Sequence, residues 1–160
     1  SNTVRITTED GTVNPPPPSS EYFDGVTLSG NEDVEQAIPH LRRLGITGIR
    51  MWSDFEWDRH NFKDAWAKAI QYHDAGFHVT LLLQDDKVPT YEQAKNYFEF
   101  AVSRPRLAEA VDRWEIINEP NLWQYWRGTA RQYVQNVLRA ASDVFRPRGE
   151  LVVGAATAWD

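Results

Sequence analysis

The sequence predicts an α/β fold with a parallel sheet, in the form of the N-terminal part of a TIM (β/α)8 barrel with about five strands and four helices. First, short β-branched runs alternate with amphipathic stretches of about a dozen residues from Phe23 onward. Second, alternation this regular is typical of right-handed βαβ units in a parallel sheet. Third, no glycine-rich phosphate loop follows the first predicted strand, which favours a barrel over a nucleotide-binding doubly wound sheet.

Each element follows from a local pattern. The apolar residues of the helices recur at helical spacing, and the third strand is a near-continuous apolar run, as expected where both faces of a parallel strand are covered. Gly45 and Gly76 follow the first two helices, where left-handed C-caps are common. Thr90 and Gln93 form a capping box at the start of the third. The predicted strands are 25–28, 46–52, 77–84, 113–118 and 151–155, and the predicted helices are 34–44, 62–73, 90–102 and 129–145.

The fourth helix has the most complete apolar stripe, and it is predicted to end before Pro147. We expect it to bury Tyr133, Val134, Val137, Leu138, Ala141 and Phe145. The predicted domain organisation has two parts: residues 1–20 form an N-terminal arm or linker, and residues 21–160 form the portion of the barrel. The arm is predicted from the proline run at residues 15–18, which lacks backbone donors and prefers an extended form.

Composition excludes several classes of partner and cofactor. The 160 residues include 17 Lys and Arg against 23 Asp and Glu, a net charge of −6 without a basic run, which argues against nucleic-acid and membrane partners. No apolar run approaches the roughly 20 residues that span a bilayer. The absence of cysteine and the scattered histidines predict no metal site, and no organic cofactor is implied. The chain begins with Ser1, so its localisation stays open, with secretion preferred to a cytoplasmic location.

One motif carries the predicted chemistry. Asn118-Glu119-Pro120 follows an apolar strand, at the end of the barrel where (β/α)8 enzymes keep their catalytic groups. Glu119 on this rigid element can act as a general acid towards a glycosidic oxygen, and the Asn118 amide can bind a sugar hydroxyl near the reacting carbon. Pro120 is expected to hold Glu119 in an extended conformation, because proline restricts the residue before it.

The second predicted strand contributes two further candidates. Alternation places Arg50 and Trp52 on the barrel-interior face, with Ile49 and Met51 towards the helices. A buried Arg50 needs a carboxylate partner, because an unpaired buried charge is very costly. The pairing with Asp54 or Glu56 at the rim is one alternative. Trp52 is a candidate platform for the face of a sugar ring.

The residues from Trp114 to Trp126, read as Trp-Glu-Ile-Ile-Asn-Glu-Pro-Asn-Leu-Trp-Gln-Tyr-Trp, resemble the fourth strand of clan A retaining glycoside hydrolases, which are (β/α)8 barrels. Within that clan the segment is most similar to the β-xylosidase and α-iduronidase family. The resemblance implies that Glu119 is the acid/base and that Asn118 holds the sugar 2-hydroxyl. It also implies that Arg50 orients the nucleophilic carboxylate. The implied substrate is an oligosaccharide or glycoside with β-linked pentose or hexose units.

The resemblance also places the nucleophile on a seventh strand, which is not among the five predicted here. Three explanations stay open. The chain is a fragment of a longer enzyme; or it is a partial barrel that forms a homodimer through its open sheet edges; or it is a carbohydrate-binding or scaffold protein that keeps Glu119 without its partner. In a pseudo-twofold dimer, Asp85 would occupy the place of the missing nucleophile.

Other conspicuous residues receive structural interpretations. Glu115 is expected one layer deeper than Glu119 on the same face, as a structural partner rather than a catalyst. The acidic segments 54–58 and 85–86 are interpreted as solvated rim. Five tryptophans follow predicted strands, and each is expected to serve packing more than binding: Trp52, Trp57, Trp123, Trp126 and Trp159.

Overall fold

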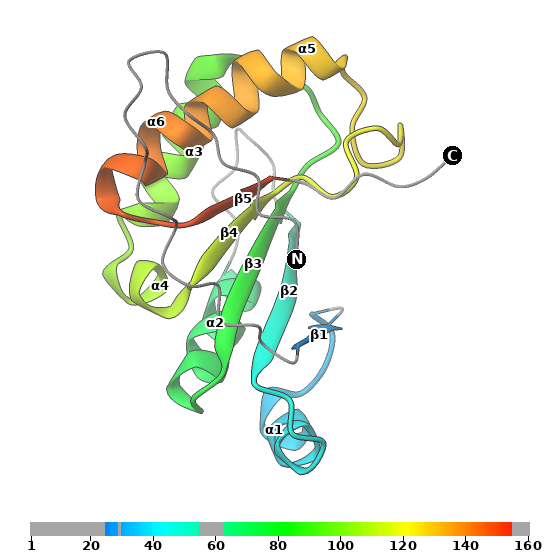
Figure 1. Ribbon diagram of the computed structural model, residues 1–160, viewed down its shortest axis with the longest axis vertical. Helices are drawn as coiled ribbons and strands as arrows, with labels where there is room; N and C mark the ends of the chain where they lie inside the picture. The colour runs from blue at the N-terminus through cyan, green and yellow to red at the C-terminus, as the bar shows by residue number, and fades with distance from the viewer. Residues whose placement is uncertain (1–24, 29, 55–62, 155–160) are drawn as a thin grey trace, which may run out of the picture.

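The computed structural model describes residues 25–28, 30–54 and 63–154. Its centre is a parallel five-stranded sheet in which every strand pairs with the next along the chain. Figure 1 shows the strands fanning out in this order from β1 to β5. The strands are β1 (Gly25–Leu28), β2 (Gly48–Asp54), β3 (His78–Gln84), β4 (Arg113–Ile116) and β5 (Val152–Gly154). The predicted fold class, an α/β chain wound like the first five strands of a (β/α)8 barrel, is confirmed.

Helices connect the strands, and one of them was not predicted. The extra helix, α4, begins with a proline at its first turn and is too short for periodicity to reveal it. The last helix is continuous but changes to a π-helix in its middle part. The helices are α1 (Val34–Arg43), α2 (Lys63–Asp74), α3 (Tyr91–Val102), α4 (Pro105–Ala110), α5 (Ala130–Gln132), the π-helix η1 (Tyr133–Leu138), α6 (Arg139–Phe145) and the 3-10 turn η2 (Arg146–Arg148).

Local signals for the helix ends are confirmed. Thr90 accepts from the Gln93 backbone N–H while the Gln93 side chain accepts from the Thr90 N–H, which completes the capping box of α3. Gly45 and Gly76 have φ angles of 72° and 89°, the left-handed conformation that lets the chain leave α1 and α2 towards the next strand. Asp33, whose carboxylate accepts from two backbone N–H groups, caps α1 and was missed by the sequence analysis.

The two faces of the sheet differ in chemistry. One face packs against the helices and carries most of the apolar side chains of the strands, among them Ile49, Met51, Val79, Leu81, Leu83, Trp114 and Ile116. The register places Arg50, Trp52, Leu82, Gln84 and Glu115 on the opposite face. This second face is the barrel-interior face that strand alternation predicts, and it bears the charged and amide groups of the candidate site.

The expected burial of Val134 is wrong. Its side chain is 54% exposed, whereas Tyr133 and Val137 are buried. The π-helix η1 explains the difference, because its i→i+5 hydrogen bonds widen the turn and shift which residues face the sheet. Downstream of the π-helix, Ala140 and Val144 join Ala141 and Phe145 in the core.

Candidate active site at the carboxyl ends of the strands

A bidentate ion pair joins β2 to β4 across β3. Arg50 Nε and Nη2 donate to the two carboxylate oxygens of Glu115 at 2.6 and 2.8 Å. Glu115 is 6% exposed as a residue, and the Arg50 side chain keeps 28% exposure. The structure therefore confirms that Arg50 has a carboxylate partner and that Glu115 is a satisfied structural partner. The Asp54 side chain and Glu56 lie outside the described residues.

Asn118 connects this ion pair to Glu119 through two hydrogen bonds. Arg50 Nη2 also donates to Asn118 Oδ1 at 3.0 Å, and Asn118 Nδ2 donates to Glu119 Oε2 at 3.0 Å. Because Arg50 can only donate, the amide of Asn118 is oriented with its oxygen towards Arg50 and its NH2 group towards Glu119. Three of the four predicted site residues thus form one chain of contacts.

The charge of Arg50 is stabilised within this network. Its pKa is raised from the usual value, chiefly because the guanidinium donates to Glu115. Burial acts in the opposite direction, and the negative charges of Glu115 and Glu119 add to the increase. Arg50 therefore stays cationic, with two carboxylates around it, and its own bidentate partner is Glu115 rather than Glu119.

The backbone after β4 departs from the predicted extended path. The strand ends at Ile116, two residues before the predicted end, and Ile117 and Glu119 have φ angles of 60° and 39°. The expectation that Pro120 holds Glu119 extended is wrong. Two hydrogen bonds outweigh that preference: Ile117 N–H donates to the Leu83 carbonyl of the neighbouring strand at 2.9 Å, and the Glu119 carbonyl accepts from Leu122 N–H at 2.8 Å in a local turn.

Two buried side chains support this strained turn. Gln84 Oε1 accepts from the Asn118 N–H at 2.8 Å, and Gln84 Nε2 donates to the Tyr125 carbonyl at 2.8 Å. The Tyr133 hydroxyl donates to the Ile116 carbonyl at 2.7 Å. A β-branched residue at positive φ persists only where its surroundings hold it, and these contacts surround Ile117 on both sides. We refer to Gln84 and Tyr133 as the turn supports.

Neither turn support was predicted from the sequence as a site residue. Gln84 is an amide at the end of an apolar run, and strand alternation alone places it on the interior face. Tyr133 was assigned to the core on periodicity alone. Nothing in the sequence indicated that its hydroxyl binds the last carbonyl of β4, because that contact joins residues 17 positions apart.

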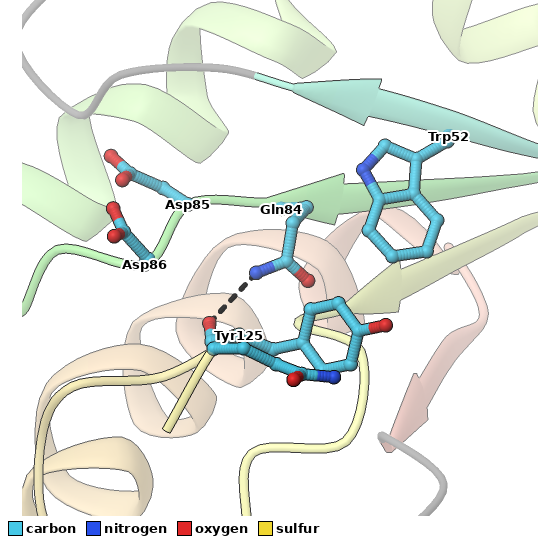
Figure 2. A pocket seen from close by; sticks show the side chains of 6 residues that line it. Trp52, Gln84, Asp85, Asp86 and Tyr125 are labelled. Carbon is cyan, nitrogen blue, oxygen red and sulfur yellow. Dashed lines mark hydrogen bonds between the residues drawn. The ribbon is translucent and has the colours of Figure 1, made fainter. Parts of the chain in front are cut away.

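A pocket of about 300 Å³ opens beside these groups, between the ends of β2 and β3 and the β4–α5 loop (residues 117–129). Trp52, the fourth predicted site residue, lies in its wall, with its ring centre 5.7 Å from that of Tyr125 and 6.0 Å from Arg50 Cζ. Figure 2 shows both aromatic rings on one side of Gln84 and two carboxylates on the other. The lining residues are Trp52, Gln84, Asp85, Asp86, Gln124 and Tyr125.

The loops around the pocket are tied together. Arg127 Nη2 lies 2.6 Å from Asp86 Oδ2, and the Arg127 N–H donates to the Asp86 carbonyl at 3.1 Å. Gly128 lies so close to Val88 that an added Cβ would be 2.7 Å from the Val88 side chain. The β3–α3 and β4–α5 loops therefore form one packed wall.

The remaining candidate residues separate into buried, exposed and undescribed groups. Trp126 is 2% exposed, and its indole N–H donates to the Thr129 carbonyl, as expected of a packing tryptophan. Trp123 is 75% exposed. Asp85 is 6% exposed, and its carboxylate accepts from the Lys87 N–H at 2.9 Å. Trp57, Trp159, the arm at residues 1–20 and most of the acidic segment at 54–58 lie outside the described residues.

Within residues 25–28, 30–54 and 63–154, no three His, Asp or Glu side chains are grouped as metal ligands would be. In the same ranges, no helix has both the length and the apolar character that a bilayer crossing needs. The fold and the site define an α/β protein of parallel, barrel-like winding, with a network of arginine, amide and carboxylate groups at the carboxyl ends of its strands.

Comparison with known proteins finds a distant structural likeness. No protein-family model matches the chain, and no curated protein matches it. The chain is similar to the crystal structure of a β-glucosidase from Exiguobacterium marinum, with 19% identity and a TM-score of 0.40. The match covers 54% of this chain and 24% of that chain, so it spans about a quarter of the length of the β-glucosidase chain.

Proposed function

We propose that the protein is a glycoside hydrolase that cleaves β-linked pentose or hexose units with retention, and that Glu119 is its general acid/base. The observation that supports this proposal best is the contact chain from Arg50 through Asn118 to Glu119. These contacts orient the Glu119 carboxylate beside the Asn118 amide at the ends of the strands. A pocket with aromatic side chains in its lining lies next to them. These are the groups that glycosidic bond cleavage requires on one side of the sugar.

The proposed reaction has two steps. In the first, protonated Glu119 gives its proton to the glycosidic oxygen as the bond to the anomeric carbon breaks, and a second carboxylate forms a bond to that carbon. In the second, ionised Glu119 takes a proton from water, whose oxygen displaces the second carboxylate. The second carboxylate comes from outside this chain or from a partner, where Asp85 of another copy is one candidate. Glu115 is not a candidate, because both of its oxygens are bound to Arg50.

Leaving-group dependence tests the role of Glu119. In the active assembly, Glu119→Gln should lower the hydrolysis of phenyl β-glycosides by about 10²- to 10⁴-fold, the usual contribution of general acid catalysis. Bond cleavage should be nearly unchanged for dinitrophenyl β-glycosides, since their leaving group departs without a proton. Glu92→Gln, which changes an exposed carboxylate of α3, is the matched control. Equal effects on both substrates would refute the assignment of Glu119.

A carbohydrate-binding protein without turnover is the second candidate function. The observation that favours it is the pocket itself, since aromatic and carboxylate groups line it whether or not a second catalytic carboxylate is supplied. This alternative expects measurable affinity for oligosaccharides and no hydrolysis of any aryl glycoside. Trp52→Ala should weaken the affinity, and Glu119→Gln should not remove it.

A further inference from the structure

One buried side chain holds both ends of the segment that carries Glu119. Gln84, the last residue of β3, is 6% exposed. Its Oε1 accepts from the Asn118 N–H at 2.8 Å, and its Nε2 donates to the Tyr125 carbonyl at 2.8 Å. Figure 2 shows the second of these bonds. Residues 118–125 are therefore fixed to β3 at their first and last members, and we refer to them as the acid segment.

Hydrogen bonds within the acid segment connect its two ends to Glu119. The Glu119 carbonyl accepts from the Leu122 N–H at 2.8 Å, and the Leu122 carbonyl accepts from the Tyr125 N–H at 3.0 Å. At the other end, Asn118 Nδ2 donates to Glu119 Oε2 at 3.0 Å. The position of the Glu119 carboxylate therefore depends on where the two ends of the segment are fixed.

The backbone of this region does not hold its conformation by local preference. Ile117 and Glu119 have φ angles of 60° and 39°, which residues other than glycine adopt only where neighbouring contacts hold them. The second turn support acts just before the acid segment, where the Tyr133 hydroxyl donates to the Ile116 carbonyl at 2.7 Å. Tyr133 is the first residue of the π-helix η1, and π-helical turns are frequent at functional sites.

The amide of Gln84 contributes to the site rather than to the pairing of strands. Gln84 follows three buried leucines of β3, and a buried polar group in such a run is costly unless it is hydrogen bonded. Both of its backbone partners, Asn118 and Tyr125, belong to the acid segment. Strain that is held in place by buried hydrogen bonds is a feature of sites that keep a side chain in one productive position.

We propose that Gln84 is a positioning residue for the Glu119 carboxylate and that Tyr133 assists it. The proposal rests on the proposed function, in which Glu119 gives a proton to the glycosidic oxygen. Gln84 acts through the backbone of the acid segment and does not itself transfer a proton. Such an effect on the rate is expected to be large, because a displacement of about 1 Å at a reacting group can cost about 10²-fold.

Leaving-group dependence distinguishes a displaced acid from a loss of folded protein. Gln84→Met keeps the length of the side chain but removes the donor and the strong acceptor. In the active assembly, kcat/KM for a phenyl β-glycoside should fall by about 10- to 100-fold. For the dinitrophenyl β-glycoside of the same sugar it should fall by about threefold or less, since that leaving group departs without a proton. A loss of folded protein lowers both values by the same factor.

A second variant and two controls complete the experiment. Tyr133→Phe removes a single hydroxyl, and it decides the outcome if too little Gln84→Met protein folds. It should lower the phenyl value by about three- to tenfold and leave the dinitrophenyl value nearly unchanged. Gln71→Met makes the same chemical change at an exposed position of α2, and Leu107→Ala removes a buried side chain of α4, which precedes the other end of β4. Both controls should leave the ratio of the two values unchanged.

The proposal is overturned if either folded variant of the turn supports lowers both values by the same factor, or if Leu107→Ala changes their ratio as much as Gln84→Met does. If Glu119→Gln selectively lowers the phenyl value but Gln84→Met does not, Glu119 is still the acid and only the positioning role fails. If Glu119→Gln has no selective effect, or the assembly hydrolyses neither glycoside, the proposed function fails and the positioning role fails with it.

Discussion

Replacing Gln84 by methionine tests whether one buried amide holds the turn that carries Glu119. Methionine matches glutamine in length but has no donor and only a weak acceptor. The change leaves the buried Asn118 N–H without its 2.8 Å acceptor, which costs about 2 kcal/mol. It also removes the donor to the Tyr125 carbonyl, at the edge of an open pocket where water can reach it, which costs about 1 kcal/mol.

The expected total loss of unfolding free energy is therefore about 3 kcal/mol, equivalent to a decrease of roughly 6–12 °C in Tm for a domain of this size. Urea unfolding followed by circular dichroism measures it. Gln124→Met, which makes the same chemical change at an exposed position of the same pocket, should stay within about 0.5 kcal/mol of the unmodified protein. A Gln84→Met loss no larger than that of Gln124→Met would refute the reasoning that the turn depends on Gln84.

Three further changes test other parts of the site and core. Glu115→Ala should lower the free energy of unfolding by about 2–3 kcal/mol, less than a fully buried pair loses, because the Arg50 side chain keeps 28% exposure. Urea unfolding measures it, and Glu109→Ala, at an exposed position of α4, should have little effect. Tyr133→Phe should cost about 1–2 kcal/mol in the same assay, since the Ile116 carbonyl loses a buried donor, and a change near zero would mean that this hydroxyl contributes nothing. Burial, and then Glu32, raises the pKa of Tyr72 to about 12, so its contribution to stability is complete below about pH 10 and is lost as the pH rises through 12. Tyr72→Phe should make the fall in Tm between those pH values shallower, and an unchanged slope would contradict this pKa.

The elements whose determining pattern is local lie closest to their predicted positions. The strand 25–28 has the predicted bounds, and the strand 77–84 begins one residue later than predicted. The glycines after α1 and α2 and the capping box of α3 act within one or two turns, so their residue types alone indicate the helix ends. The error at Val134 arose because a π-helix changes the angular spacing, and no single residue signals such a change.

Part of the candidate site followed from the same local reasoning. The carboxyl ends of parallel strands lie at the same edge of the sheet. The predicted strands therefore place Arg50, Asn118 and Glu119 close together without knowledge of any contact. The carboxylate partner of Arg50 was predicted as a class but not as Glu115 in particular. Its identity depends on the register of β2, β3 and β4, and register is set by packing across the whole sheet.

By itself, the sequence determined the order of the strands and of the four longer helices, the parallel direction of the strands and the end of the sheet at which polar groups gather. Those properties depend on spacings of a few residues. Only the tertiary structure decided that Arg50 binds Glu115, that Gln84 and Tyr133 support the turn at Ile117, and that Glu119 adopts a positive φ against the preference before Pro120. The hydrogen bonds of Arg50, Gln84 and Tyr133 join residues at least 17 positions apart, and such bonds outweigh local backbone preferences of about 1–3 kcal/mol once the sheet and helices have packed.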